Sequence, residues 1–154
     1  MIRVVFFGVS GKIYKKHQGR KIKTKFVNLE GKMSARELLK KYEIEINKHN
    51  FNLIEPLVSK DCKFWFSSGT YQGIEQVREA FEKTWDMIKE EVYSITEIEW
   101  IAESESSAVC TYTFKWKGLI KGELSEGKGR GTSCFRLESN EWKIVHEHLS
   151  NFPR

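Results

Sequence analysis

Proline and cysteine are scarce in this sequence. Its 154 residues include two prolines and three cysteines. The cysteines, Cys62, Cys110 and Cys134, are odd in number and lack CxxC or Cys/His spacing, which argues against both a disulfide framework and a zinc site. We therefore expect a reducing, cytoplasmic setting, and we expect neither a metal nor a cofactor.

The sequence also lacks a long apolar run. No stretch of about 18 apolar residues could span a bilayer, and the N-terminal "MIRVVFFGVSGK" lacks the organisation of a signal peptide. We expect no membrane partner. What is present suits one domain, because 40% hydrophobic and 13% aromatic residues can form a real core at this length.

Positive charge is concentrated at the N-terminus. Residues 1–33 hold nine Lys/Arg and one acidic residue, Glu30, whereas the remainder is mildly acidic. We interpret residues 1–33 as a basic, flexible leader and residues 34–154 as the folded domain. An arm for nucleic acid or acidic lipid is one alternative, but a solvated tail is the more common use of such a run. We expect no nucleic-acid partner.

A second interpretation concerns translation of the gene. Glu30-Gly31-Lys32 can be encoded by purine-rich codons that resemble a bacterial ribosome-binding site, and Met33 directly precedes a helix start. We hypothesise that Met33 is the natural start in a bacterial gene. Mapping the N-terminus of the protein from its native cell would test this, and abundant product starting at Met1 would contradict it.

Two helical segments come first in the domain. Ser34 and Glu37 form a capping box, and apolar residues then recur at three- and four-residue intervals over 35–49. A short helical turn is predicted around Pro56. A second amphipathic stripe follows an aromatic strand at 61–66 and consists of Ile74, Val77, Phe81, Trp85 and Ile88.

Four strands are predicted after the helices, at 92–102, 107–118, 129–138 and 141–150. Short turns between them imply antiparallel hairpins, although 119–128 is predicted to be a longer connection. The alternate glycines Gly127, Gly129 and Gly131 are predicted to form a hairpin turn and a bend of the sheet. Helices followed by a strand meander indicate an α+β fold in which a curved antiparallel sheet packs on N-terminal helices.

The predicted inward faces of these strands are rich in aromatic residues. Alternation places Tyr112, Trp116 and Ser133 on the core side, and Trp142, Ile144, His146 and His148 share one face of the last strand if it is regular. Glu147 would then point the other way. An aromatic lining with a few polar groups is typical of a ligand pocket.

The two histidines have several possible uses. An imidazole can act as a general base near neutrality, but no carboxylate is predicted on the same face to orient it. The H-x-H spacing supplies two metal ligands without an evident third. Structural use, ligand recognition and catalysis therefore stay open for His146 and His148.

The end of the chain carries a family resemblance. "GRGTSCFRLESNEWKIVHEHLS" resembles the C-terminal hairpin of the SnoaL-like branch of the nuclear transport factor 2-like superfamily, with its W-x-I-V-H-x-H-x-S strand. It is also similar to the association domain of calcium/calmodulin-dependent protein kinase. The resemblance implies a cone-shaped fold, a pocket between helices and sheet, and often a homodimer through the outer face of the sheet.

We accordingly expect a small-molecule-binding domain whose ligand is partly apolar, and a homodimer. The alternatives are an isomerase, dehydratase or hydrolase that uses His146 or His148 as general base, and a domain for dimerisation or assembly. The Asp/Tyr pairs of the family's steroid isomerases and the Asp-Arg-Asp set of its epoxide hydrolases have no evident counterparts on the predicted inward faces. The predicted pocket residues are Phe64, Trp65, Tyr112, Trp116, Ser133, His146 and His148. Either Phe64 or Trp65 could face inward, because a bulge would exchange them.

Overall fold

The computed structural model describes residues 16–17, 20–21 and 32–152. Residues 1–32 and 33–154 form two compact units. In the first, β1 (Lys16–His17) and β2 (Arg20–Lys21) pair antiparallel. The predicted flexible leader otherwise falls on residues outside this description. Within the described ranges, no helix is both long and apolar enough to cross a membrane.

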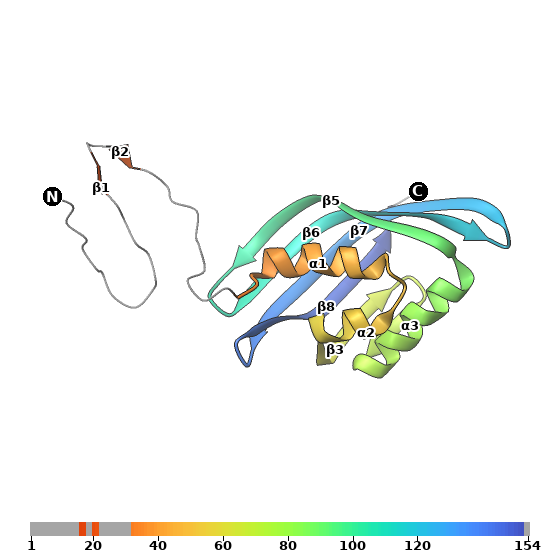
Figure 1. The fold of residues 1–154 in the computed structure, drawn as a ribbon, viewed down its shortest axis with the longest axis horizontal. Coiled ribbons are helices and arrows are strands. Elements are labelled where there is room, and N and C mark those ends of the chain that lie inside the picture. Colours follow the sequence, from red (N-terminus) through yellow and green to blue (C-terminus); the bar gives the residue numbers. More distant parts are fainter. Residues whose placement is uncertain (1–15, 18–19, 22–31, 153–154) are drawn as a thin grey trace. The chain divides into compact units, whose positions relative to one another are not determined.

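The helices of the second unit begin close to where the sequence predicts them. They are α1 (Ala35–Ile46), α2 (Phe51–Ile54), the 3-10 turn η1 (Glu55–Leu57) and α3 (Ile74–Met87). The capping box of α1 is confirmed, because the Ser34 hydroxyl accepts from the Glu37 N–H and the Glu37 carboxylate accepts from the Ser34 N–H. The three helices lie on one side of the sheet (Figure 1).

Six strands form the large sheet in the order β4-β3-β8-β7-β6-β5. They are β3 (Val58–Phe66), β4 (Gly69–Gln72), β5 (Lys89–Glu103), β6 (Ser107–Ile120), β7 (Glu123–Glu138) and β8 (Glu141–Asn151). The α+β class and the curved sheet on N-terminal helices are as predicted. One pair departs from the antiparallel expectation, since β3 runs parallel to β8.

The predicted connection at 119–128 is mostly strand. β6 and β7 form a long hairpin whose turn is Lys121-Gly122, both with positive φ, as a tight primed hairpin turn requires. Gly127, Gly129 and Gly131 therefore lie inside β7 and not at a bend. They are paired with Trp116, Phe114 and Tyr112 of β6.

These glycines make room for the aromatic rings of β6. A Cβ added at Gly131 would come within 2.1 Å of the Tyr112 ring, and one at Gly129 within 2.6 Å of the Phe114 ring. Both distances are too short for any side chain. The alternate glycines thus allow large rings to lie close to the neighbouring strand.

A β-bulge divides β8 into two halves. Cys134 of β7 is paired with His146 and Phe135 with Ile144, so Val145 has no partner in the ladder. Two successive residues then lie on the outer side, and the alternation of side chains shifts by one position beyond the bulge. Ile144 and Glu147 both point inward as a result, and both are almost completely buried.

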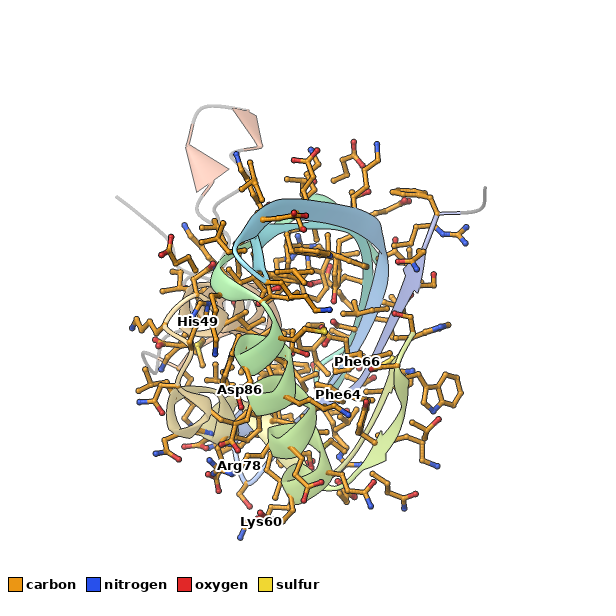
Figure 2. All side chains as sticks on the ribbon, turned by 90° about the vertical axis from the view of Figure 1, so that its right-hand side faces the viewer. His49, Lys60, Phe64, Phe66, Arg78 and Asp86 are labelled. Atoms are coloured by element: carbon orange, nitrogen blue, oxygen red, sulfur yellow. The ribbon has the colours of Figure 1, made fainter. Side chains whose placement is uncertain are left out.

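The core lies between the helices and the concave face of the sheet. Phe64 and Phe66 point from β3 toward α3, where Phe66 packs against Phe81 with ring centroids 6.1 Å apart (Figure 2). Tyr42 of α1 is completely buried, as is Phe64. This interior contains the polar groups considered next.

Candidate functional site

Glu147 is the acidic residue at the centre of the interior. Its side chain is 1% exposed and accepts hydrogen bonds from three hydroxyl groups. Tyr112 donates to Oε1 over 2.6 Å and Tyr42 to Oε2 over 3.0 Å, and Ser133 lies 3.5 Å from Oε1. We call these four residues, from α1, β6, β7 and β8, the Glu147 cluster.

The environment of Glu147 changes its acidity. Burial raises the pKa of the carboxyl to about 7, and the hydrogen bonds from Tyr112, Tyr42 and Ser133 oppose that rise. The same burial, together with the nearby carboxylate charge, raises the pKa values of Tyr42 and Tyr112 well above their usual range. The tyrosines therefore stay protonated hydrogen-bond donors, while Glu147 can gain or lose a proton near neutrality.

Tyr93 and Glu91 extend the polar interior along β5. Burial raises the pKa of Tyr93 well above its usual range, and so do the charges of Glu147 and Glu91. Glu91 is 7% exposed, and burial raises the pKa of its carboxyl to about 7. The interior between the helices and the sheet thus contains a second acid, Glu91, whose protonation changes near neutrality.

The predicted inward position of His146 and His148 is wrong. His148 is exposed and His146 is half-buried, and both rings contact Trp65 on the outer face of the sheet, with centroids 5.6 and 4.8 Å apart. The His146 Nδ1 donates to the Lys63 carbonyl over 2.5 Å. The physical reason is the bulge at Val145, which turns these side chains outward and Glu147 inward.

The remaining predicted pocket residues divide between the two faces. Phe64, Tyr112 and Ser133 are buried inside, and Trp116 packs partly buried against the core. Trp65 is 44% exposed, which settles that Phe64 and not Trp65 faces inward. The structure therefore brings Tyr112 and Ser133 together at Glu147, and it places Trp65 with the two histidines outside.

Two clefts of the structure lie away from the Glu147 cluster. One, of about 490 Å³, lies where β3 bulges away from β8 and includes an ion-paired group of Ser59, Asp61, Arg136 and Glu138. The other, of about 380 Å³, lies between α1 and β5. Neither contains a member of the Glu147 cluster, and all four side chains of the cluster are buried, so the cluster is closed in this conformation.

The cluster has the groups that proton transfer needs. A carboxyl with a pKa near 7 can act as acid or base at physiological pH, and fixed hydroxyls can stabilise negative charge that develops on a bound oxygen. Among residues 32–152, no three His, Cys, Asp or Glu side chains come close enough to hold a metal ion. The four side chains of the cluster themselves supply hydrogen bonding and proton exchange.

Sequence reasoning missed Glu147 because it assumed that β8 is regular. An acid between two histidines looks like the solvent side of a strand when alternation is counted from Ile144. One signal was present, since Tyr112 and Ser133 were already predicted to be inward polar groups without a partner. Tyr42 falls in the helical stripe over 35–49, where its ring predicts a core position and the sequence gives no sign of a partner for its hydroxyl.

Comparisons with solved structures identify the same architecture. A nuclear transport factor 2-like superfamily protein from Salmonella enterica superposes with a TM-score of 0.70 at 19% identity, covering 77% of this chain and 88% of that one. A candidate calcium/calmodulin-dependent protein kinase II association domain from Xanthomonas campestris gives 0.69 at 20% identity, covering 85% and 96%. A candidate scytalone dehydratase from Novosphingobium aromaticivorans gives 0.67 at 13% identity, covering 77% and 81%.

These similarities show the fold. No functionally curated protein matches the chain in sequence. The model of the SnoaL-like domain matches residues 36–154, which include the helices and the complete six-stranded sheet. By this match the chain belongs to the family of SnoaL-like domains.

Proposed function

We propose that this protein binds a small, partly apolar molecule inside its cone, with Glu147 as the residue that hydrogen-bonds the ligand or exchanges a proton with it. The observation that carries the proposal is the Glu147 cluster itself, in which two tyrosines and a serine surround a buried carboxyl. Aromatic side chains around a few convergent polar groups are the usual composition of a ligand site.

The cost of burying an acid supports a functional role for Glu147. Removing a carboxyl from water is unfavourable even when it is hydrogen-bonded, and an apolar residue of similar size would often stabilise a core better. A fold that needed only packing at this position would do better with leucine or methionine. Binding or proton transfer gives the carboxyl a use that offsets the cost.

The cluster assigns different tasks to its members under this proposal. Protonated Glu147 can donate to a carbonyl or hydroxyl of the ligand, and ionised Glu147 can accept a proton from it. Tyr42 and Tyr112 hold the carboxyl in place. Because the cluster is closed, the cone must open to admit a ligand. An isomerase, dehydratase or hydrolase built on this site would use Glu147 as general base in preference to His146 or His148.

A thermal-shift screen against chemically diverse small molecules tests the proposal. A ligand of the cone raises the melting temperature of the wild type and raises that of Glu147→Gln by much less, because the amide has the shape of the carboxyl without its acidity. The exposed Glu141→Gln is the matched control. His146→Ala and His148→Ala retain the shift if the ligand lies inside. Equal shifts in the wild type and Glu147→Gln would contradict the assignment.

We further propose a homodimer formed through the outer face of the sheet. Trp65, His146 and His148 form an aromatic cluster there, and a large exposed aromatic group is a common centre of a protein interface. Light scattering on a sizing column tests this. Trp65→Lys should yield monomers, whereas Leu53→Lys, an exposed site on α2, should not. A wild type that is monomeric at all concentrations would contradict the proposal.

A reducing, cytoplasmic location is also proposed. Its support is that Cys62, Cys110 and Cys134 are all free thiols, with Cys62 and Cys110 buried. Labelling of thiols in protein from unbroken native cells, with reductant omitted, tests it. Extensive oxidation would contradict a reducing compartment.

A further inference from the structure

A groove between α1 and β5 lies apart from the Glu147 cluster. Its volume is about 380 Å³, which is within the range of small-molecule sites, about 300–1,000 Å³. One wall comes from successive turns of α1, and the other comes from Ile95 to Trp100 of β5. We call it the α1–β5 groove, and it is lined by Arg36, Leu39, Lys40, Glu43, Ile95, Ile98 and Trp100.

The floor of the α1–β5 groove is apolar. Leu39 and Ile95 are buried in the core, and Trp100 packs on Phe135 with ring centroids 5.3 Å apart. Ile98 is 45% exposed, so an aliphatic surface is available to a ligand. Burying such surface is favourable at about 25 cal/mol for each Å².

The rim of the groove carries two basic side chains, Arg36 and Lys40, and one acidic side chain, Glu43. Arg36 stacks on Trp100 at 4.8 Å and forms an ion pair with Glu103. Glu43 accepts a hydrogen bond from the Ile95 N–H over 2.7 Å, so one of its oxygens is occupied. Lys40 makes no hydrogen bond or ion pair within residues 32–152 and is free to meet an anion.

We propose that the α1–β5 groove binds an elongated apolar carboxylate, a medium-chain fatty acid by chemical class, with its chain along Leu39, Ile98 and Trp100 and its carboxylate at Lys40. The groove shares no residue with the Glu147 cluster, so this site is additional to the proposed function. Arg36 is ion-paired with Glu103 and Glu43 is held by the Ile95 N–H, so Lys40 is the charge of the groove lining that a ligand would meet, and it favours an anionic head group.

A peptide strand suits the groove less well than a fatty acid. A peptide would have to extend the sheet at β5, which is an edge strand. The ladder of β5 shifts register between Thr96 and Glu99 and again between Trp100 and Ala102, and Glu97 has a φ of 55°. Such bulges interrupt the row of backbone groups that a new strand needs.

Titration of the full-length protein with sodium decanoate, below its micelle concentration, tests the proposal. Two-dimensional NMR of the indole N–H groups locates the site, with the Trp100 signal assigned by Trp100→Phe. Decanoate should shift that signal, and decyltrimethylammonium, of equal chain length and opposite charge, should not. Lys40→Glu should weaken decanoate binding about fivefold or more. The variant loses the ion pair between Lys40 and the decanoate carboxylate and places a like charge there instead.

The matched control is Lys41→Glu, which makes the same charge change one residue away and outside the groove. It should bind decanoate like the wild type, and so should Glu147→Gln, which separates this site from the cone interior. Equal binding of both amphiphiles, or equal loss in Lys40→Glu and Lys41→Glu, would overturn the proposal. Dissociation of oligomers by Lys40→Glu without decanoate binding would instead assign the groove to a second copy of the chain.

Discussion

At the scale of single residues, the buried carboxyl of Glu147 makes stability depend on pH. Its pKa is about 7 in the folded protein and close to the ordinary 4.5 when unfolded. Between these values the folded state holds a proton that the unfolded state has lost, so raising the pH favours unfolding. The stabilisation is complete below the unfolded pKa and is lost as the pH passes the folded one.

Urea unfolding at a series of pH values measures this effect. Stability should fall between about pH 5 and pH 8 by roughly 3 kcal/mol for Glu147, with a further decrease from Glu91, whose pKa is also about 7. In Glu147→Gln, only the decrease in stability that is due to Glu91 should remain. A pH profile of Glu147→Gln identical to that of the wild type would show that Glu147 does not titrate in this window.

Gly131 provides a second prediction at this scale. In Gly131→Ala the new methyl group would meet the Tyr112 ring at 2.1 Å, so the ring must move and its hydrogen bond to Glu147 must lengthen. We expect a loss of about 2–3 kcal/mol in the free energy of unfolding. Thr132→Ala, on the outer side of the same strand, should cost less than about 1 kcal/mol. Equal costs would contradict the ring contact.

Much of the residue-level pattern could be predicted from the sequence, and the exceptions have one physical cause. The inward positions of Tyr112 and Ser133 follow from regular alternation and are confirmed by burial. The sides of the sheet on which Glu147 and the two histidines lie could not be predicted. A bulge needs only one additional residue in the strand, and that residue does not change the composition detectably. Val145 is β-branched and looks like any strand residue.

At the scale of elements, α1 covers the exposed edge of β5. The Asn47 amide donates to the Tyr93 carbonyl and accepts from the Tyr93 N–H, over 2.8 and 2.7 Å. Glu43 accepts from the Ile95 N–H, and the His49 Nε2 donates to the Glu91 carbonyl. Side chains of the helix and the residues after it thus satisfy backbone groups that an edge strand would otherwise present to another chain.

Asn47→Ala should uncover this edge. Two backbone groups lose their partners, and we expect the free energy of unfolding to fall by about 2 kcal/mol. Hydrogen exchange at the Tyr93 amide should become faster than in the wild type. Lys41→Ala on the exposed side of α1 serves as the control and should leave that amide unchanged. Unaltered exchange at Tyr93 in Asn47→Ala would contradict the bonding described.

Element boundaries were predictable where a side chain defines them. Ser34 and Glu37 mark the start of α1, and that start is confirmed. The length of the β6–β7 hairpin was underestimated, because Gly127 and Gly129 look like turn residues when their cross-strand partners are unknown. A glycine in a strand and a glycine in a turn have the same sequence signal until the facing ring is known.

At the scale of the whole molecule, the unit 33–154 contains the whole of the family match, residues 36–154, and begins three residues before it. We predict that a chain starting at Met33 folds and melts within about 3 °C of the full chain, because the helices and the six-stranded sheet are retained. Calorimetry of both chains measures this. A fall of more than about 5 °C would mean that residues 1–32 stabilise the domain, and would weaken the hypothesis of a natural start at Met33.

The overall fold was predictable because its pattern involves many residues, whereas the parallel pair was not. Helical stripes and alternating strands each repeat over ten or more positions, so single errors do not alter the class. The pairing of β3 with β8 joins segments about eighty residues apart, and no local signal specifies its direction.

The contact between Gly131 and Tyr112 has a spectroscopic consequence. One Hα of Gly131 points at the Tyr112 ring, along the direction in which a Cβ would lie 2.1 Å from the ring. The ring current should move that proton far from its usual resonance. Because the Tyr112 hydroxyl bonds Glu147 directly, the same resonance should shift again as the carboxyl titrates. A glycine without a side chain thereby becomes an internal reporter of the proton on the buried acid.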